Sequence, residues 1–156
     1  MIILGIDPGT TRIGFGVVES DKNRLTVVDY GIISAPGKNK TADYKLISEK
    51  LSEIISAHKP ERAGVEKLFF SNNQKTAMSV AEARGVIMLT LANHGLKIRE
   101  VTPQEVKQGI SGYGKADKNQ VQRMVRLILG IKTGIRPDDA ADALAIAICC
   151  TNNNIY

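Results

Sequence analysis

The order of hydrophobic patterns along the chain most constrains its fold. An apolar run at residues 2–6 stops at Asp7-Pro8-Gly9, and the segments 13–19 and 25–34 are rich in valine, isoleucine, glycine and aromatic residues. Short runs of this composition that end at turn residues predict strands. Because only a few polar residues separate the second segment from the third, the three predict an antiparallel meander.

The pattern then changes from the period of strands to that of helices. Leucines and isoleucines three and four apart predict a helix over 42–58, with Thr41 or Asp43 as its cap and Pro60 after its end. Strands that are joined through helices run parallel. The chain therefore predicts one α/β domain, residues 1–156, with a mixed five-stranded sheet flanked by helices. Its further elements are a strand at 62–70, a long helix at 74–93 that Gly95 ends, a strand at 98–101, and helices near 117–130 and 138–151.

Two carboxylates stand where a buried strand is expected to be apolar. Asp7 ends the first strand, and Glu66 lies inside the fourth. If these strands are parallel neighbours, both acids lie toward the carboxyl end of the sheet, where α/β folds bind their ligands. A charge in a buried strand is costly unless it is paired or bound to a metal. The alternative, a solvated Glu66 and an Asp7 that only forms a turn before Pro8, stays open on these residues alone.

A third acidic segment follows Pro137 near the C-terminal end. Asp139 and Asp142 are three residues apart, and Asp138 and Asp142 are four apart, so either pair projects from one face of a helix. Acids also stabilise the first turn of a helix, which accounts for one of the three. The alanines between them allow the helix to lie close to the sheet. We therefore expect two of these three acids to lie near Asp7 and Glu66. The spacing alone does not show whether Asp138 or Asp139 is one of the two.

Four carboxylates from three separate segments repel one another unless a cation lies between them. Oxygen ligands of this kind select Mg²⁺ or Mn²⁺ over zinc or copper. Two such ions ~3.5–4 Å apart activate a water molecule and stabilise the leaving oxygen in phosphodiester cleavage. The acids therefore predict a nuclease with two Mg²⁺ ions, for which Mn²⁺ substitutes.

The distribution of charge fits a polyanionic substrate. The net charge is +5, but residues 97–136 hold nine lysines and arginines against three acids, whereas residues 137–156 hold three acids and no basic residue. This step predicts a surface that holds phosphates beside an acidic site. The basic segment includes Lys107, Lys115, Lys118, Arg123 and Arg126, although a solvated helix face accounts equally well for any one of them.

Other function classes find no support in the sequence. No apolar run approaches the ~20 residues needed to span a bilayer, and the first residues lack the pattern of a signal peptide. The adjacent Cys149 and Cys150 predict packing inside a helix rather than a disulfide or a zinc site. We expect a cytoplasmic protein that makes no contact with membranes.

Together these motifs resemble the RuvC family of Holliday-junction resolvases over nearly the whole chain. The matching segments are ILGIDPGTTRIGFGVV, VEKLFFSNNQKTAMSVAEARGVI, VTPQEVKQGISGYGKADKNQVQRMV and PDDAADALAIAI. The resemblance implies a ribonuclease H-like fold, a homodimer, and magnesium-dependent paired nicking of four-way DNA junctions in recombination and repair. It also implies the RuvA–RuvB branch-migration complex as a partner.

The resemblance also implies roles for single residues, by their position in these motifs. The catalytic and metal-binding set is Asp7, Glu66, Asp139 and Asp142. The family ends this set with an acid or histidine followed three residues later by aspartate, which selects Asp139 and leaves Asp138 as a helix cap. In resembling resolvases a phenylalanine at the position of Phe69 stacks on bases at the junction centre. The alternative for that ring is the core.

Lys107 and Lys118 match basic positions beside the family's active site. The helix at 74–93 carries Gly85 in its interior, where glycine costs ~1 kcal/mol against alanine, so we expect another backbone to approach it closely. The resemblance assigns this helix to the dimer interface.

Two other functions compete with the nuclease. A junction-binding protein without catalysis would need the basic segment but not acids in three separate segments. An actin-like phosphotransferase would use the turn Asp7-Pro8-Gly9-Thr10, but such enzymes usually need two domains of this kind. Cleavage of a four-way junction, or turnover of ATP, separates these alternatives.

Overall fold

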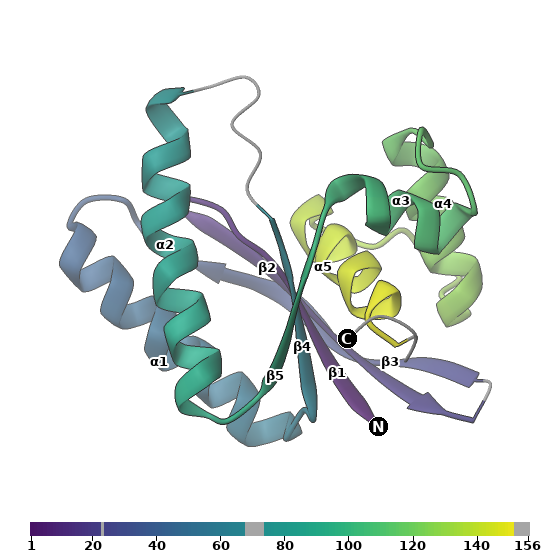
Figure 1. Ribbon diagram of the computed structural model, residues 1–156, viewed down its shortest axis with the longest axis horizontal. Helices are drawn as coiled ribbons and strands as arrows, with labels where there is room; N and C mark the ends of the chain where they lie inside the picture. Colours follow the sequence, from purple (N-terminus) through teal and green to yellow (C-terminus); the bar gives the residue numbers. More distant parts are fainter. Residues whose placement is uncertain (23, 68–73, 152–156) are drawn as a thin grey trace.

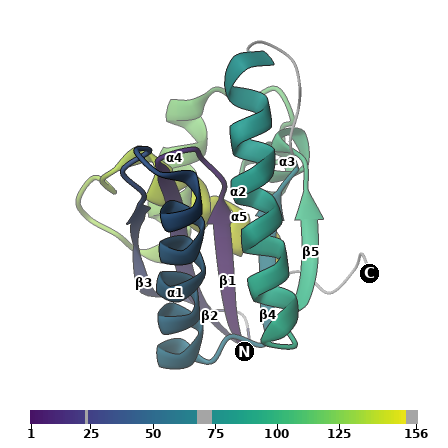
Figure 2. The same cartoon turned by 90° about the vertical axis from the view of Figure 1, so that its left-hand side faces the viewer.

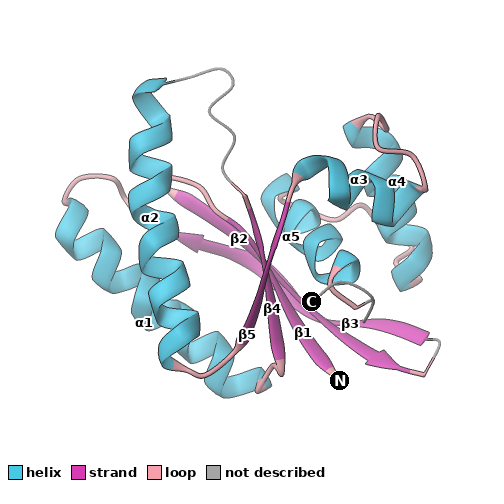
Figure 3. Ribbon diagram, viewed as in Figure 1, coloured by secondary structure: helices cyan, strands magenta, loops and turns pink. Residues whose placement is uncertain are grey.

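The computed structural model describes residues 1–22, 24–67 and 74–151, which form a sheet between two layers of helices (Figure 1). The helices α1 and α2 cover one face of the sheet, and α3, α4 and α5 cover the other (Figure 2; Figure 3). In chain order the elements are β1 (Ile2–Asp7), β2 (Arg12–Asp21), β3 (Arg24–Ser34), α1 (Lys40–His58), β4 (Arg62–Glu66), α2 (Gln74–Asn93), β5 (Lys97–Val101), α3 (Pro103–Ser111), α4 (Lys118–Leu129) and α5 (Asp138–Cys149).

The sheet is mixed, with five strands in the order β3-β2-β1-β4-β5. The pairs β1–β2 and β2–β3 are antiparallel, whereas β4 runs parallel to both β1 and β5. This confirms the predicted meander followed by parallel crossovers. Ile6 of β1 lies opposite Val65 of β4, so Asp7 and Glu66, one residue further on, end neighbouring strands at the same level.

The C-terminal helix α5 lies directly against the backbone of the sheet. A Cβ atom at Gly5 would lie 2.0 Å from the carbonyl oxygen of Ala143, and one at Gly14 would lie 2.0 Å from the carbonyl oxygen of Asp139. These strand positions must therefore be glycine for the helix to approach so closely. The facing alanines of α5 are buried, which confirms their predicted role as small residues that bring the helix to the sheet.

Apolar side chains fill both faces of the sheet. One buried cluster joins the sheet to α1 and α2, and the other joins it to α3, α4 and α5. Cys149 and Cys150 are free thiols in the second cluster, as predicted, and burial raises the pKa of the Cys150 thiol to about 12. Within the described residues, no helix is long and apolar enough to cross a membrane.

The boundaries of α1 correct one prediction. Neither Thr41 nor Asp43 caps this helix, because it begins earlier and Asn39 accepts a hydrogen bond from the backbone N–H of Ala42. Asp43 is instead buried in the first turn, where its carboxylate accepts a hydrogen bond from the N–H of Gly37 at 3.0 Å. This bond fixes the loop that precedes the helix.

The helix α3 is an element that the sequence prediction left out. Thr102 and Glu105 form a reciprocal capping box with Pro103 at the first turn, and Gly112 ends the helix in the left-handed conformation. The strand predicted over 62–70 also ends early, at Glu66, and residues 68–73 lie outside the described part of the chain. By contrast, Gly95 follows α2 with φ of 71°, as predicted.

The space around Gly85 in the interior of α2 is open within this chain, so the expected close approach of another backbone stays a prediction for a partner chain. A Cβ atom at Gly85 would meet nothing within 4 Å in the described chain, so no backbone of the same chain approaches it. The residue is exposed on the outer side of the helix, away from the sheet.

Candidate active site

Asp7 and Glu66 meet at the carboxyl end of the two central parallel strands. In each strand a run of buried residues precedes the acid, and the acid itself is half-buried. The backbone carbonyl of Glu66 accepts a hydrogen bond of 3.0 Å from Nε of Arg84 on α2. Arg84 also pairs with Glu100 on β5, so the end of β4 is held by its neighbours.

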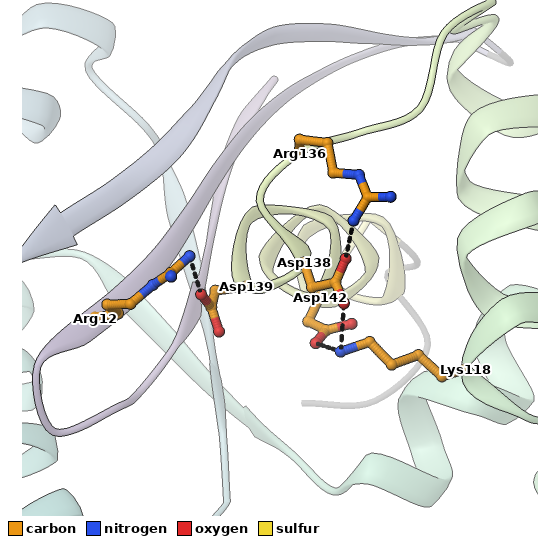
Figure 4. Close-up of polar contacts among 6 residues, drawn as sticks. All are labelled: Arg12, Lys118, Arg136, Asp138, Asp139 and Asp142. Atoms are coloured by element: carbon orange, nitrogen blue, oxygen red, sulfur yellow. Dashed lines mark hydrogen bonds and ion pairs between the residues drawn. The ribbon is translucent and has the colours of Figure 1, made fainter.

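The first two turns of α5 carry Asp138, Asp139 and Asp142 to the same edge of the sheet (Figure 4). Asp139 pairs with Arg12 at the start of β2, with Oδ2 and Nη2 2.9 Å apart. Asp142 accepts a hydrogen bond of 3.0 Å from Nζ of Lys118 at the start of α4. The two acids therefore face opposite cations, one from the sheet and one from α4.

The four acids predicted from the sequence lie within range of one another's charge. Burial, and then the charges of Glu66, Asp142 and Asp139, together raise the pKa of Asp7 to about 8, although Lys118 opposes the shift. Burial, and then the charge of Asp142, raise the pKa of Glu66. The pKa of Asp142 is also raised, chiefly by burial, although Lys118 lowers it. A site that disfavours its own negative charge in this way favours an added cation.

Asp138 behaves differently from its neighbours. It is not the helix cap that the sequence predicted, because Pro137 occupies that position and no side chain makes a capping bond. Its carboxylate lies 3.6 Å from Nζ of Lys118 and 3.7 Å from Nη1 of Arg136. It shares a cation with Asp142 but is absent from the groups that shift the pKa of Asp7.

A pocket of about 280 Å³ opens beside Glu66 and Asp142. Lys107 of α3 and Lys118 of α4 line it together with the two acids, so two of the predicted DNA-binding lysines lie at the site. The side chain of Lys115 is exposed and does not line this pocket. Phe69 lies outside the described residues.

The chemistry of these groups fits a hard divalent cation. The donors are carboxylate oxygens only, and burial and neighbouring charge disfavour the charged forms of Asp7, Glu66 and Asp142. Among the described residues, no three acid, histidine or cysteine side chains are gathered closely enough to hold a metal ion as they stand. This is expected where carboxylates repel one another and two of them pair with Arg12 and Lys118.

Sequence reasoning missed two cations of the site, Arg12 and Arg136. Arg12 follows the turn after Asp7, and Arg136 precedes the proline at the start of α5. Nothing in the local spacing of Arg12 signals a partner, because only the tertiary fold brings Asp139 near it, whereas Arg136 pairs with Asp138, two positions further along the chain. The one available signal was their nearness in sequence to the acidic motifs.

Comparison with known proteins agrees with this geometry. The family model described as crossover junction endodeoxyribonuclease RuvC matches residues 3–150. The protein with this name from Alkaliphilus oremlandii is 49% identical to the chain, and the match covers 96% of this chain and 92% of that protein. The protein with this name from Halothermothrix orenii is 47% identical, and the match covers 98% of this chain and 93% of that protein. The structure of Thermus thermophilus RuvC in complex with a Holliday junction substrate superposes with a TM-score of 0.89 at 33% identity, covering 96% of this chain and 92% of that one. The expected ribonuclease H-like architecture is thereby confirmed, and the chain belongs to the RuvC family of crossover junction endodeoxyribonucleases.

Proposed function

We propose that this chain resolves four-way DNA junctions by paired symmetric nicks, as a step of homologous recombination and DNA repair. The observation that carries the proposal is the convergence of Asp7, Glu66, Asp139 and Asp142, where burial and then the charges of the other three acids raise the pKa of Asp7 to about 8. Its family is one of metal-dependent nucleases. We further propose two Mg²⁺ ions at these acids, for which Mn²⁺ substitutes.

The residues of the site have two proposed roles, binding the metal ions and binding the DNA. Asp7, Glu66, Asp139 and Asp142 would hold the metal ions, which when bound activate water and stabilise the leaving oxygen. The buried ends of β1 and β4 fix Asp7 and Glu66, and α5 presents the other two acids from across the site. Lys107 and Lys118, which line the adjacent pocket, orient the phosphate backbone by charge.

Two further residues belong to the proposed DNA interface. Lys115 is exposed between α3 and α4, where a flanking phosphate can reach it. For Phe69 we retain the role implied by the family resemblance, stacking on the bases at the junction centre, where each stacked base contributes ~1–3 kcal/mol.

A homodimer would present two such sites to the two-fold symmetry of a junction. Its interface is proposed on the outer side of α2, where Met78 and Leu89 are 70% and 63% exposed. Gly85 lies between them in sequence, and the open space around it suits the close approach of a second helix. We also propose a single nuclease domain, a cytoplasmic location and the RuvA–RuvB branch-migration complex as a partner.

A cleavage assay on a labelled synthetic four-way junction tests the proposal. With Mg²⁺ we expect symmetric nicks, and with EDTA none, whereas duplex and single-stranded DNA of the same sequence stay intact. Asp7→Asn and Glu66→Gln should each abolish cleavage while the junction still binds. Lys45→Gln, on the exposed side of α1, is the matched control and should cleave normally. Cleavage without metal, or in both acid variants, would contradict the proposal.

A further inference from the structure

A second polar pocket lies beside α4 and the loop that leads to α5. Its volume is about 430 Å³, and the side chains of Gln122, Arg123, Arg126 and Arg136 contribute to its lining. It shares no lining residue with the pocket beside Glu66 and Asp142. We call it the arginine pocket.

Two donors of the arginine pocket have no acceptor. Nε of Arg126 and Nε2 of Gln122 are buried, and neither has a hydrogen-bond partner among the described residues. A buried donor without an acceptor costs free energy, and most such groups in proteins are satisfied. Both orphaned atoms carry N–H groups, so the group that completes this pocket supplies oxygen acceptors.

The positive charge of the arginine pocket indicates an anionic ligand. Within the described part of the chain, neither Arg123 nor Arg126 forms an ion pair, and Arg136 pairs only with Asp138, at 3.7 Å. A water molecule would satisfy the orphaned donors but would not balance guanidinium groups gathered around one hollow. Arginine binds phosphate through parallel hydrogen bonds from its planar fork of donors, so a phosphate group fits both the charge and the missing acceptors.

The position of the pocket relates it to the active site. Lys118, Gln122 and Arg126 follow one another at four-residue steps on α4, so they form a row along the helix, each step advancing ~6 Å. The row begins at Lys118, which contacts Asp142. Arg136 also lines a hollow that contains Arg12 and Asp139, so it lies between the arginine pocket and the acids.

We propose that the arginine pocket binds a backbone phosphate of the DNA at a position away from the bond that is cut. The inference rests on the proposed function, because a DNA strand that is cut at the acids places its other phosphates at fixed distances from them. The pocket would hold the arm of the junction that runs along α4 as it leaves the active site.

Salt-dependent binding tests the proposal with Arg126→Gln and Arg123→Gln. Anisotropy of a labelled four-way junction in EDTA gives Kd as a function of NaCl concentration. Each lost phosphate contact should flatten the slope of log K against log salt by about one unit and weaken binding about tenfold near 0.1 M salt. Lys45→Gln removes one charge from the opposite side of the sheet and should match the unaltered protein. Equal slopes in all these proteins would overturn the proposal.

Three further measurements keep the outcomes distinct. Arg123 is exposed, so its variant retains the fold even if Arg126→Gln unfolds, and urea unfolding checks both. Mg²⁺-dependent cleavage by the unaltered protein tests the proposed function separately, so cleavage with unchanged slopes overturns the arginine pocket alone. Thermal unfolding in inorganic phosphate and in chloride at equal ionic strength tests a free anion. Stabilisation by phosphate that Arg126→Gln loses, with an unchanged slope for DNA, would overturn the assignment to a DNA phosphate.

Discussion

Arg12 and Asp139, which lie far apart in the sequence, form an ion pair in which Nη2 and Oδ2 are 2.9 Å apart. Lys118 contacts Asp142 on the other side of the acidic cluster at 3.0 Å. The chain thus supplies two of its own cations to carboxylates that are proposed to bind metal. A divalent ion that binds there competes with these ion pairs.

The first prediction concerns this competition. Arg12→Gln should raise the affinity for Mn²⁺ in the absence of DNA, because Asp139 loses its competing partner. Both side chains are partly exposed, and exposed ion pairs contribute ~0.2–1 kcal/mol, so we expect at most about a fivefold lower Kd. Titration calorimetry measures it, with Lys45→Gln as the control. An unchanged or weaker Mn²⁺ affinity would show that Arg12 does not compete.

The second prediction concerns the buried Asp7. Its pKa is raised to about 8, first by burial and then by Glu66, so the folded state binds its proton more tightly than the unfolded chain does. Without metal, the free energy of unfolding should therefore fall as pH rises from about 4 to about 8. Asp7→Asn removes this penalty and should stabilise the metal-free protein by roughly 1–3 kcal/mol at pH 8, and by less at pH 6.

Urea denaturation in EDTA at the two pH values measures the effect of Asp7→Asn. Glu61→Gln, an exposed acid before β4, is the control and should show no such gain. A variant that is less stable than the unaltered protein at pH 8 would show that Asp7 carries no electrostatic penalty.

The third prediction concerns the contact between α5 and the sheet. Gly14→Ala places a Cβ atom 2.0 Å from the carbonyl oxygen of Asp139, so the start of α5 must move. We expect a loss of about 3 kcal/mol in the free energy of unfolding and slower junction cleavage. Gly134→Ala, where a Cβ atom meets nothing within 4 Å, should change neither. Unfolding curves and single-turnover rates report both effects, and a fully active, stable Gly14→Ala protein would contradict the close packing.

The fourth prediction concerns the proposed dimer. Leu89→Glu places a charge in the apolar outer side of α2 and should convert the dimer to a monomer in sedimentation velocity at micromolar concentration. Val28→Glu on β3 is the control, because Val28 is also exposed, at 44%, but lies on another element. A monomeric unaltered protein would remove the proposed interface.

The fifth prediction concerns Phe69. Phe69→Ala should weaken junction cleavage while leaving the free energy of unfolding nearly unchanged, because a ring that stacks on DNA makes no core contact. Comparing single-turnover cleavage with urea unfolding of the same variant measures both. An equal loss in activity and stability would indicate that the ring packs in the core.

The sequence predicted the sheet and its acids because both follow from local pattern. An apolar run that stops at Asp7 marked the end of the first strand, Glu66 lay inside the fourth predicted strand, and helical crossovers required these strands to be parallel. The alanines of α5 indicated the close approach that Gly5 and Gly14 now explain. Spacing left Asp138 and Asp139 equivalent, and the family resemblance selected Asp139. In the fold, the charge of Asp139 is one of those that raise the pKa of Asp7.

The features that the sequence prediction missed or misplaced were missed for identifiable physical reasons. The helix α3 buries only Val106 and Ile110, a stripe too short to stand out, although Thr102 and Glu105 carried its capping signal. The cap of α1 was misplaced because Asn39, Thr41 and Asp43 all suit the position, and tertiary contact with Gly37 decided which of them is buried. The role of Arg12 depends on a partner 127 positions away, which no local pattern reveals.

The packing of α5 on glycine has a consequence for how the site tolerates change. Main-chain atoms, rather than side-chain shape, set the separation between α5 and the sheet, at Gly14 for Asp139 and at Gly5 for the strand that carries Asp7. Repacking the two cores can therefore alter stability while the carboxylate frame keeps its dimensions. The cations around that frame, Arg12 and Arg136, project from the surface and can be exchanged one at a time. The fold thus separates the main-chain packing that positions the acids from the exposed cations that pair with them.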